Sequence, residues 1–302
     1  MDQIQCMRAF VQVADLQGFS RAARKLGLTP GAVSKHISAL EAHLGVKLFH
    51  RTTRQLNLSH EGELYLLHSR QLLADLEEAD HTVGQKKGEI AGMLRIAAPL
   101  SFSQHHLTAA VGDYLQLHPN MEIELELNER YIDLIAEGFD LAIRIGQLED
   151  TSLMVRKLAP LKLGFYAAPS YLATHQAPEE PSDLSHHHCL LYTAVNRAPI
   201  GVWHLKDAQG TTHRIKVKGR LKANNGDILR QAACQGLGIV ALPSFMLGDD
   251  VKQGRLKPIL PHYHFSQGGI HAVFPPNRNM TRRVRSFIDF LHQRWRQNRP
   301  WD

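Results

Sequence analysis

Gly27 stands between two short helical patterns and, more than any other residue, limits how the start of this 302-residue chain can fold. Before it, residues 21–26 have helical spacing and follow a good N-cap residue, Ser20. After it, Thr29 is a favourable N-cap, and Pro30 suits the first position of a further helix. Two helices joined by a tight turn that contains glycine are typical of a helix-turn-helix unit, and an ordinary helical hairpin is the alternative.

The apolar spacing extends this pattern in both directions. Residues 4–15 predict a preceding helix that ends at Gly18, and the helix after the turn is predicted to continue to Gly45. Ala23 is small at the point where the two helices of the unit cross, and Val33 fills the space between them. These spacings favour a DNA-binding head.

Charge is spread unevenly along the chain. Residues 1–60 contain eight Lys and Arg residues and three acidic residues, whereas the whole chain has a formal net charge of +6. Residues 61–90 have the opposite excess, with seven acidic and three basic residues. A compact basic head is expected of a module that binds DNA phosphates, although a solvated basic face would give the same count.

The polar side of the third helix and the segment after it carry the candidate DNA contacts. Ser34 and Lys35 are predicted to face the major groove, on the side opposite the apolar face of the helix. Residues 46–59 predict a short hairpin, or wing, whose Arg51 and Arg54 reach phosphate or the minor groove. The groove-facing set is Thr29, Gly31, Ser34, Lys35 and His36.

A long helix is predicted over 60–87, with Ser59 as its N-cap. Its apolar residues Leu72, Leu76, Ala79 and Val83 follow steps of four, three and four, which is the spacing of a coiled-coil seam. A basic head on such a rod predicts a dimer that reads two half-sites. The alternative is a single helix that lies on the neighbouring domain.

Beyond residue 89, strand patterns alternate with helical ones, which predicts α/β lobes with mostly parallel sheets. Strands are predicted at 94–98, 121–127, 140–146, 163–168, 189–193, 238–242 and 270–274, with a strand hairpin over 203–222. Helices are predicted at 104–117, 131–137, 170–175, 227–234 and 281–297.

Motifs within residues 19–62 are shared with a known family. They are Phe19-Ser20-Arg21-Ala22-Ala23, Leu28-Thr29-Pro30-Gly31-Ala32-Val33-Ser34-Lys35-His36-Ile37, Leu44-Gly45-Val46-Lys47-Leu48-Phe49-His50-Arg51 and Leu58-Ser59-His60-Glu61-Gly62. In these motifs and in its length the chain resembles a LysR-type transcriptional regulator, and it looks most similar to the branch with a Ser/Thr-Pro-x-Ala-Val-Ser recognition helix. Gly31 departs from that branch, which usually has serine there, and Lys35 and His36 stand where arginine and glutamine are common.

The resemblance implies an all-α winged helix-turn-helix at 1–59, a linker and dimerisation helix at 60–88, and an effector-binding domain at 89–302. The last would be two α/β lobes similar to a periplasmic binding protein, with the chain crossing between lobes near 163–168 and 268–272. The resemblance also implies a small organic effector, often an acid, and dimers that pair into tetramers.

Three loops are candidates for the effector site, because ligands of open α/β sheets bind beyond the carboxyl ends of the strands. The first, 99–103, follows a strand and opens a helix, whose free N–H groups suit an anion; plain N-capping by its serines is the alternative. The second is 144–147 and the third is 224–227. The candidate effector residues are Ser101, Phe102, Ser103, Arg144 and Asn225.

Other chemistry finds little support in the sequence. Three widely spaced cysteines argue against a disulfide framework and fit a reducing compartment. The run 186–189 contains three histidines and Cys189, but adjacent residues cannot all face one tetrahedral ion, so we expect no metal site. Cys234 would sense redox state only with an exposed, low-pKa thiol. With no nucleotide-binding or nucleophile motif, we expect neither a cofactor nor enzyme activity.

No signal peptide and no apolar stretch of about 18 residues is recognised, so a cytoplasmic protein without a membrane span is expected. The leading interpretation is a DNA-binding regulator that responds to a small molecule, and its partners would be duplex DNA, an effector and further copies of itself. The alternative is a small-molecule or metal-binding protein, with or without catalytic activity, whose N-terminal helices mediate only association. The basic helix-turn-helix and wing distinguish the two.

Overall fold

The computed structural model describes residues 2–51, 56–83, 89–128, 132–148, 152–193, 201–265, 268–276 and 280–301. The chain forms two compact units. The first contains Met1–Gly92 and Ile135–Gly138, and the second contains Met93–Leu134 and Phe139–Asp302.

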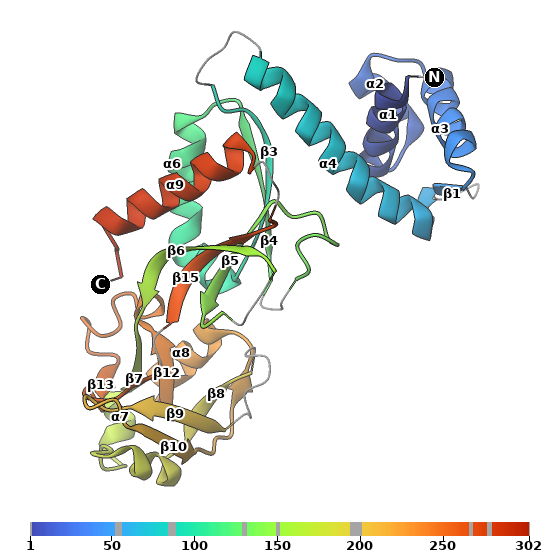
Figure 1. Cartoon of the computed structure of the whole chain (residues 1–302). Helices are drawn as coiled ribbons and strands as arrows, with labels where there is room; N and C mark the ends of the chain where they lie inside the picture. The colour runs from blue at the N-terminus through green and yellow to red at the C-terminus, as the bar shows by residue number, and fades with distance from the viewer. Residues whose placement is uncertain are drawn as a thin grey trace. The chain divides into compact units, whose positions relative to one another are not determined.

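The first unit begins with a three-helix head and a small hairpin (Figure 1). Phe10, Val33, Ile37 and Leu40 are buried at its centre, so the helical spacing of the sequence does mark the core. The strands of the wing pair in antiparallel register, with Phe49 opposite Leu58. The elements are α1 (Gln3–Leu16), α2 (Phe19–Leu26), α3 (Pro30–Leu44), β1 (Phe49–Arg51), β2 (Leu56–Leu58) and α4 (His60–Val83).

The caps around the turn confirm two predictions and correct two. Gly27 is left-handed with φ of 66°, and Thr29 Oγ1 accepts a hydrogen bond from Ala32 N at 3.2 Å. The prediction that Gly18 ends the first helix is wrong, because left-handed Gln17 closes α1 and its N–H bonds to carbonyls of that helix. Gly18 is instead the N-cap of α2, so Ser20 lies inside the helix and does not cap it.

Helix α4 leaves the head with one face on the core and another exposed. Tyr65 packs against Phe10 with ring centroids 5.7 Å apart, and Leu73 also contacts the head core. Leu72, next to Leu73 but on a different face, is 55% exposed. The side chains of Ala79 and Val83, and residues 84–87 of the predicted helix, lie outside the described part of the chain.

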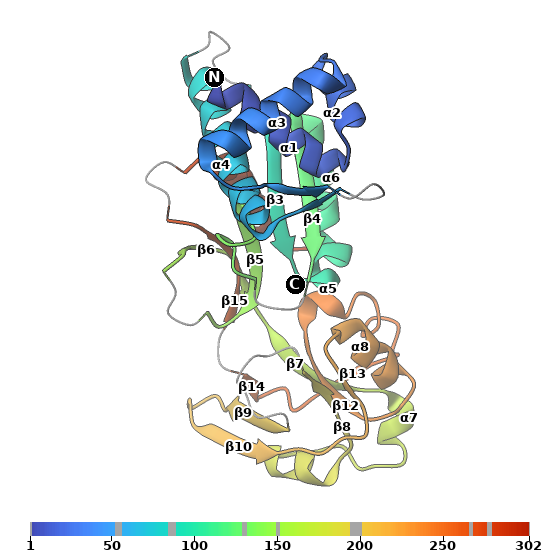
Figure 2. The same cartoon turned by 90° about the vertical axis from the view of Figure 1, so that its right-hand side faces the viewer.

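The first lobe of the second unit is a five-stranded sheet in the order β4-β3-β5-β15-β6 (Figure 2). Helix α6 packs against β4, and α9 packs against both β6 and α6. A continuous helical segment from Leu100 to Leu117 has a π-helical stretch in its middle. The elements are β3 (Gly92–Ala98), α5 (Leu100–Phe102), η1 (Ser103–Leu107), α6 (Thr108–Leu117), β4 (Met121–Leu127), β5 (Leu141–Gly146), β6 (Met154–Leu161), β15 (Gly268–Phe274) and α9 (Arg282–Gln297).

The second lobe contains a five-stranded sheet in the order β11-β8-β12-β7-β13 and a three-stranded sheet in the order β10-β9-β14. Helix α8 packs on β8, β12 and β7. The elements are β7 (Leu163–Ala167), α7 (Pro169–Leu172), η2 (Pro181–His186), β8 (Cys189–Tyr192), β9 (Val202–Lys206), β10 (Thr212–Lys216), β11 (Lys222–Ala223), α8 (Gly226–Cys234), β12 (Ile239–Pro243), η3 (Ser244–Met246), β13 (Lys257–Ile259) and β14 (His264–Phe265).

The sheets are mixed, so the prediction of mostly parallel sheets is wrong. Strand β15 is antiparallel to both β5 and β6, and β7 is antiparallel to both β12 and β13. These antiparallel strands flank the two crossovers, where the chain passes from β6 to β7 and returns before β15. Strands β7 and β15 each follow a crossover from the other lobe, and each is antiparallel to the strands beside it.

Strand β6 and the helix predicted at 131–137 also differ from the sequence prediction, and the short strands β13 and β14 were not predicted. Strand β6 was not predicted, because Met154–Leu161 includes Arg156, Lys157 and Pro160 and has no simple alternation. The predicted helix at 131–137 is wrong: the described part forms a turn, closed by a hydrogen bond from Phe139 N to Leu134 O at 2.9 Å. So short a segment is a marginal helix unless packing stabilises it.

Candidate DNA interface and effector site

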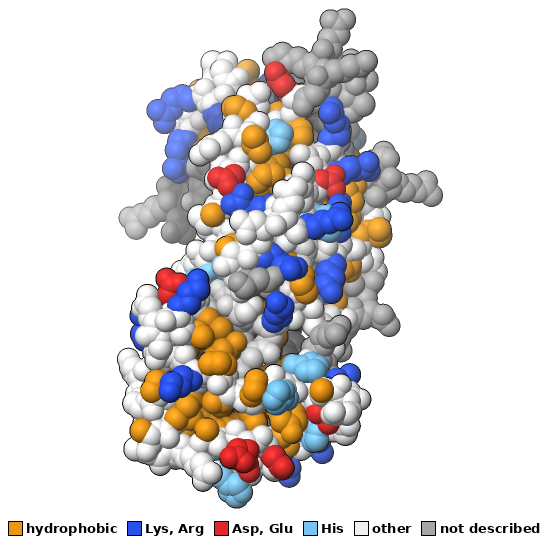
Figure 3. Space-filling view, turned by 90° about the vertical axis from the view of Figure 1, so that its left-hand side faces the viewer, with side chains coloured by type: hydrophobic (Ala, Val, Ile, Leu, Met, Phe, Trp, Pro, Cys, Tyr) orange, Lys and Arg blue, Asp and Glu red, His pale blue; other side chains and the backbone are white. Residues whose placement is uncertain are grey.

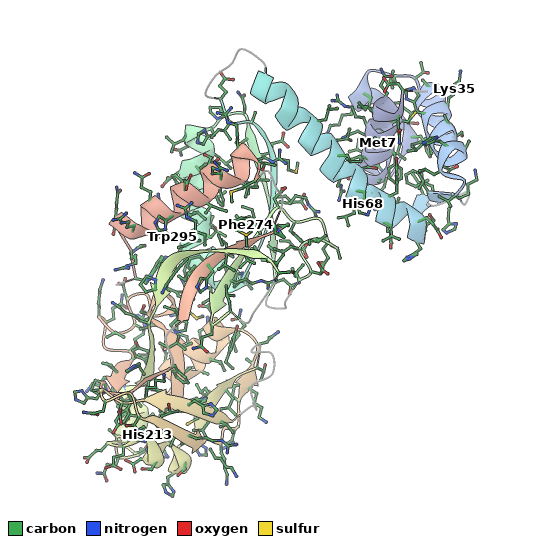
Figure 4. All side chains as sticks on the ribbon, in the orientation of Figure 1. Met7, Lys35, His68, His213, Phe274 and Trp295 are labelled. Carbon is green, nitrogen blue, oxygen red and sulfur yellow. The ribbon has the colours of Figure 1, made fainter. Side chains whose placement is uncertain are left out.

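The outer face of α3 is built by helical spacing. Val33 and Ile37 are fully buried, which turns Gly31 and Lys35 to solvent on the other side. Figure 4 shows Lys35 on the outside of α3. Thr29 is exposed, and Ser34 and His36 are half-buried. The exposed face also includes Ser38 and Ala42, which the sequence analysis did not single out.

Helix α2 adds positive charge beside this face. Arg24 and Lys25 are exposed in its last turn, where the first helix of a helix-turn-helix crosses the DNA backbone. Neither residue was predicted from the sequence as a candidate contact, although their place in the turn-helix pattern favours one. Arg51 ends β1, but its side chain is not described, and Arg54 lies outside the described residues.

A buried carboxylate holds the wing against α3. Glu41 is 4% exposed, and its Oε1 accepts hydrogen bonds from Leu48 N at 3.0 Å and Phe49 N at 3.4 Å. Its Oε2 accepts one from Lys47 Nζ at 2.8 Å. Burial raises the pKa of Glu41, but these hydrogen bonds outweigh burial, so the pKa is lowered overall. Glu41 therefore positions the wing in its charged form.

We expect Glu41→Gln to lower the free energy of unfolding of the head by about 1–3 kcal/mol at neutral pH, because it loses the charged acceptor. The folded pKa is lowered, so this stabilisation is present above about pH 5 and is lost as pH falls through the folded value. Hydrogen exchange of head amides against pH would measure both effects. If wild type and variant have the same pH dependence, Glu41 does not hold the wing as a carboxylate.

The predicted loop 99–103 lies at the start of the helical segment of the first lobe. Ser101 and Ser103 are both buried, and Ser103 Oγ donates to Pro99 O at 2.8 Å. Phe102 is fully buried, in edge-on contact with Phe245 of the second lobe at a centroid distance of 5.2 Å. Phe102 is thus part of an aromatic core rather than an exposed wall.

A histidine–carboxylate pair joins the lobes next to Ser101. His105 Nε2 lies 2.9 Å from Oδ1 of Asp227, which is in the first turn of α8. Burial raises the pKa of Asp227, but His105 and the nearby Ser101 hydroxyl outweigh it and lower the pKa. Asp227 Oδ2 and Ser101 Oγ have no partner of good hydrogen-bond geometry in the described part of the chain. Ser101 and Asp227 are therefore neighbours at this junction, but their oxygens do not meet with good hydrogen-bond geometry.

Aromatic side chains close the same junction from another side. His106 Nε2 lies 2.9 Å from the carbonyl oxygen of Phe245, and its ring centroid is 4.6 Å from that of Trp301, near the C-terminus. Trp301 also contacts Phe102. Burial lowers the pKa of His106. The sequence gives no signal that His105, His106 and Trp301 meet at this junction, because their partners are distant along the chain.

The remaining candidate effector residues, Asn225 and Arg144, form hydrogen bonds with backbone groups of their own lobe. Asn225 Oδ1 accepts a hydrogen bond from Ile228 N at 3.2 Å and so caps α8 just before Asp227. Arg144 donates to the carbonyl oxygen of Ile132 at 3.0 Å, within the first lobe. The structure thus brings loops 99–103 and 224–227 together through Asp227, whereas Arg144 is anchored elsewhere.

Histidines and cysteines are the remaining residues with candidate metal or redox chemistry. Figure 3 shows histidine side chains gathered on the second lobe, but no group of three or more His, Cys, Asp or Glu able to hold a metal occurs among the described residues. Burial raises the pKa of Cys189 to about 12. Burial, together with Asp250, also raises the pKa of Cys234, which disfavours its thiolate. Among the helices described, none is both long and apolar enough to cross a membrane.

Comparisons with known proteins agree with this architecture. Residues 4–63 match the bacterial regulatory helix-turn-helix protein of the LysR family, and residues 87–296 match the LysR substrate binding domain. A Haemophilus influenzae HTH-type transcriptional regulator is 36% identical, covering 94% of this chain and 98% of that protein. The Escherichia coli regulator YhjC is 35% identical, covering 96% and 97%.

Solved structures give the same result. The structure of CrgA, a LysR-type transcriptional regulator from Neisseria meningitidis, is 32% identical, covers 96% of this chain and 97% of that chain, and has a TM-score of 0.60. These relatives are named as regulators, which favours regulation over the alternative of a binding protein with a head for association only. The helix-turn-helix head, the two-lobed second unit and these matches show that the chain belongs to the LysR family of transcriptional regulators.

Proposed function

We propose that this protein is a sequence-specific DNA-binding transcriptional regulator whose activity responds to a small molecule bound between its two lobes. The observation that most supports DNA binding is the outer face of α3. Gly31 and Lys35 are exposed there, and Val33 and Ile37 are buried on the opposite side of the helix. A helix fixed to its core on one side presents its other side in a defined orientation to the major groove. The proposed contacts are Thr29, Gly31, Ser34, Lys35 and His36, with Arg51 and Arg54 on the wing.

Lys35→Ala is expected to weaken binding to a preferred duplex by about 1–3 kcal/mol and to relax base preference at one position, if Lys35 binds a guanine edge. The duplex would be selected from a random-sequence pool by the wild-type protein, and affinities measured by a gel-shift titration. Lys25→Ala is the matched control, because an exposed lysine on α2 should affect all sequences alike. Unchanged affinity and preference in Lys35→Ala would contradict the assignment.

For the effector, we propose a small organic acid that binds at Ser101 and competes with Asp227 for His105. An anion there would receive the Ser101 hydroxyl and the His105 ring while Asp227 is released. Because Asp227 belongs to the second lobe, the bound and free proteins would prefer different lobe arrangements, as allosteric coupling requires. Phe102, Ser103, Arg144 and Asn225 would complete the site, mainly by shaping its loops.

Two substitutions should change effector affinity in opposite directions. Ser101→Ala is expected to weaken binding by about tenfold, because a hydrogen bond to a charged ligand is lost. Asp227→Asn is expected to strengthen it, because a competing negative charge is removed. A thermal-shift screen of small organic acids, followed by calorimetry, would measure both. Ser103→Ala should have the smaller effect, since Ser103 Oγ already donates to Pro99 O. Weaker binding in Asp227→Asn would overturn the competition.

The division of the chain follows the same proposal. We assign DNA binding to 1–59, dimerisation to the helix 60–88, and effector binding to 89–302, in a protein of the Ser/Thr-Pro-x-Ala-Val-Ser branch that acts in the cytoplasm. Two heads in a dimer would read two half-sites, and dimers would pair into tetramers.

A further inference from the structure

Five basic residues stand at alternate positions between residues 214 and 222 of the second lobe. We call Arg214, Lys216, Lys218, Arg220 and Lys222 the basic stripe, and all five are exposed. Arg214 and Lys216 lie on β10 and Lys222 begins β11, and the chain bends at Arg220 between the two strands. Residues 208–226 include no Asp or Glu, so no acidic residue interrupts it.

The residues between the basic ones hold the stripe against the lobe. Ile215 and Val217 pack in the core of the second lobe. A Cβ at Gly219 would overlap the Cys189 carbonyl oxygen, so this residue lies directly on β8. Cys189 N donates to Lys218 O at 2.7 Å, which also ties the backbone at Lys218 to that strand. The basic side chains therefore project from a fixed backbone.

The charges of the stripe are not neutralised within the described part of the chain, where none of its five residues forms an ion pair. Asp207, at the turn before β10, is already engaged: its Oδ1 accepts from Thr211 N at 2.8 Å, and its Oδ2 lies 3.0 Å from His213 Nε2. Across the β9–β10 pair, His204 stands opposite Arg214. The stripe thus places five positive charges within nine residues, and an anionic polymer would relieve their mutual repulsion.

We propose that the basic stripe binds the phosphate backbone of duplex DNA that flanks the operator, an inference that rests on the proposed function. Protein–protein interfaces use buried apolar and aromatic anchors and are depleted in lysine. The stripe has three lysines and two arginines, and its apolar residues point inward. Contacts to phosphate need only cations and are independent of base sequence.

The three positions chosen for substitution, 216, 218 and 220, lie apart from the proposed effector site, whereas Lys222 in β11 leads into loop 224–227 and is kept. Strands β9 and β10 lie at the end of the second lobe that is far from the sheet of the first lobe, as Figures 1 and 2 both show. Variants of the stripe therefore leave the junction at Ser101 and Asp227 intact, and their effect on DNA can be measured without an effector.

The test uses the full-length protein and a duplex selected by the wild-type protein from a random pool. That site is placed in a short duplex and in a long one with fixed flanks, and affinity is measured against salt concentration for each. The stripe variant is Lys216→Gln/Lys218→Gln/Arg220→Gln. The matched control, Lys252→Gln/Lys257→Gln/Arg285→Gln, removes three exposed charges elsewhere on the same unit.

Wild type should have a steeper salt dependence on the long duplex than on the short one. The stripe variant should lose about 2 to 3 units of that slope on the long duplex only, at about 0.9 per phosphate contact, whereas the control keeps it. Equal slopes for the stripe and control variants, or no gain from flanks in wild type, would overturn the proposal.

A second copy of this chain is the other partner that such a stripe could bind, and sedimentation distinguishes it from DNA. Glu122 and Glu124 are exposed on edge strand β4, and a second copy could present them to the stripe. Loss of assembly in the stripe variant would therefore assign the stripe to contacts between copies and overturn the DNA proposal. If the proposed function itself is wrong, the random pool yields no preferred duplex. That result is distinct from a failure of the stripe proposal, in which a preferred duplex is found.

Discussion

Gly62→Ala is expected to unfold the head and abolish operator binding. Gly62 lies in the first turn of α4, where a Cβ would overlap the carbonyl oxygen of Leu48 and lie 3.1 Å from Leu58 Cδ2. Leu48 has no room to move, because its N–H donates to Glu41 and its carbonyl oxygen accepts from Ser59 N at 2.9 Å. Overpacking typically costs about 1–3 kcal/mol, and a fixed backbone neighbour should place this variant at or above the upper end.

Hydrogen exchange of head amides would measure the loss. Trp203, Trp295 and Trp301 are all in the second unit, so their fluorescence should remain native and show that the rest of the chain is folded. Gly31→Ala is the control, because a Cβ there meets nothing within 4 Å and alanine favours a helix. Wild-type exchange in Gly62→Ala would show that α4 and the wing can separate without cost.

The double variant Leu72→Asp/Leu76→Asp is expected to be monomeric. Leu72 is 55% exposed in the single chain, whereas Tyr65 and Leu73 of the same helix contact the head core. A large apolar side chain on the outer face of a long helix is explained by a second copy, and carboxylates in that contact would be strongly unfavourable.

Sedimentation would follow the dissociation directly. A monomer holds one half-site, so the slope of operator affinity against salt should fall to about half. Leu237→Asp, at a side chain with 54% exposure in the second unit, should leave assembly unchanged. A double variant that remains dimeric would rule out the seam.

The sequence predicts the head well because its signals are local. Thr29 and Pro30 start α3, Gly27 and Gly45 close helices, and each of these acts on neighbouring residues. Glu41 was missed, because its partners come from a hairpin whose position depends on tertiary packing. Local reasoning also placed the end of α1 at Gly18 and not at Gln17, since glutamine rarely adopts a left-handed conformation.

The residues proposed for the effector site were predicted from local patterns. The structure places Ser101 and Asn225 at the two predicted helix starts, and their role at a ligand stays a prediction. The contact between His105 and Asp227 spans 122 residues, and no local pattern indicates it. Phe102 was expected at a ligand, but contacts with Phe245 and Trp301 make it part of the core.

The two crossovers also bear on how this protein can be re-engineered. Everything from Leu163 to Phe265 belongs to the second lobe, so that lobe is a single insertion within the first. Both of its ends connect to neighbouring strands of one sheet, β6 and β15. Exchange of this one segment with that of a relative would therefore transplant one lobe and half of the proposed effector site, together with the basic stripe, while the head and α4 stay unaltered. Such hybrids would show whether this lobe determines which effector is recognised independently of which DNA sequence the head binds.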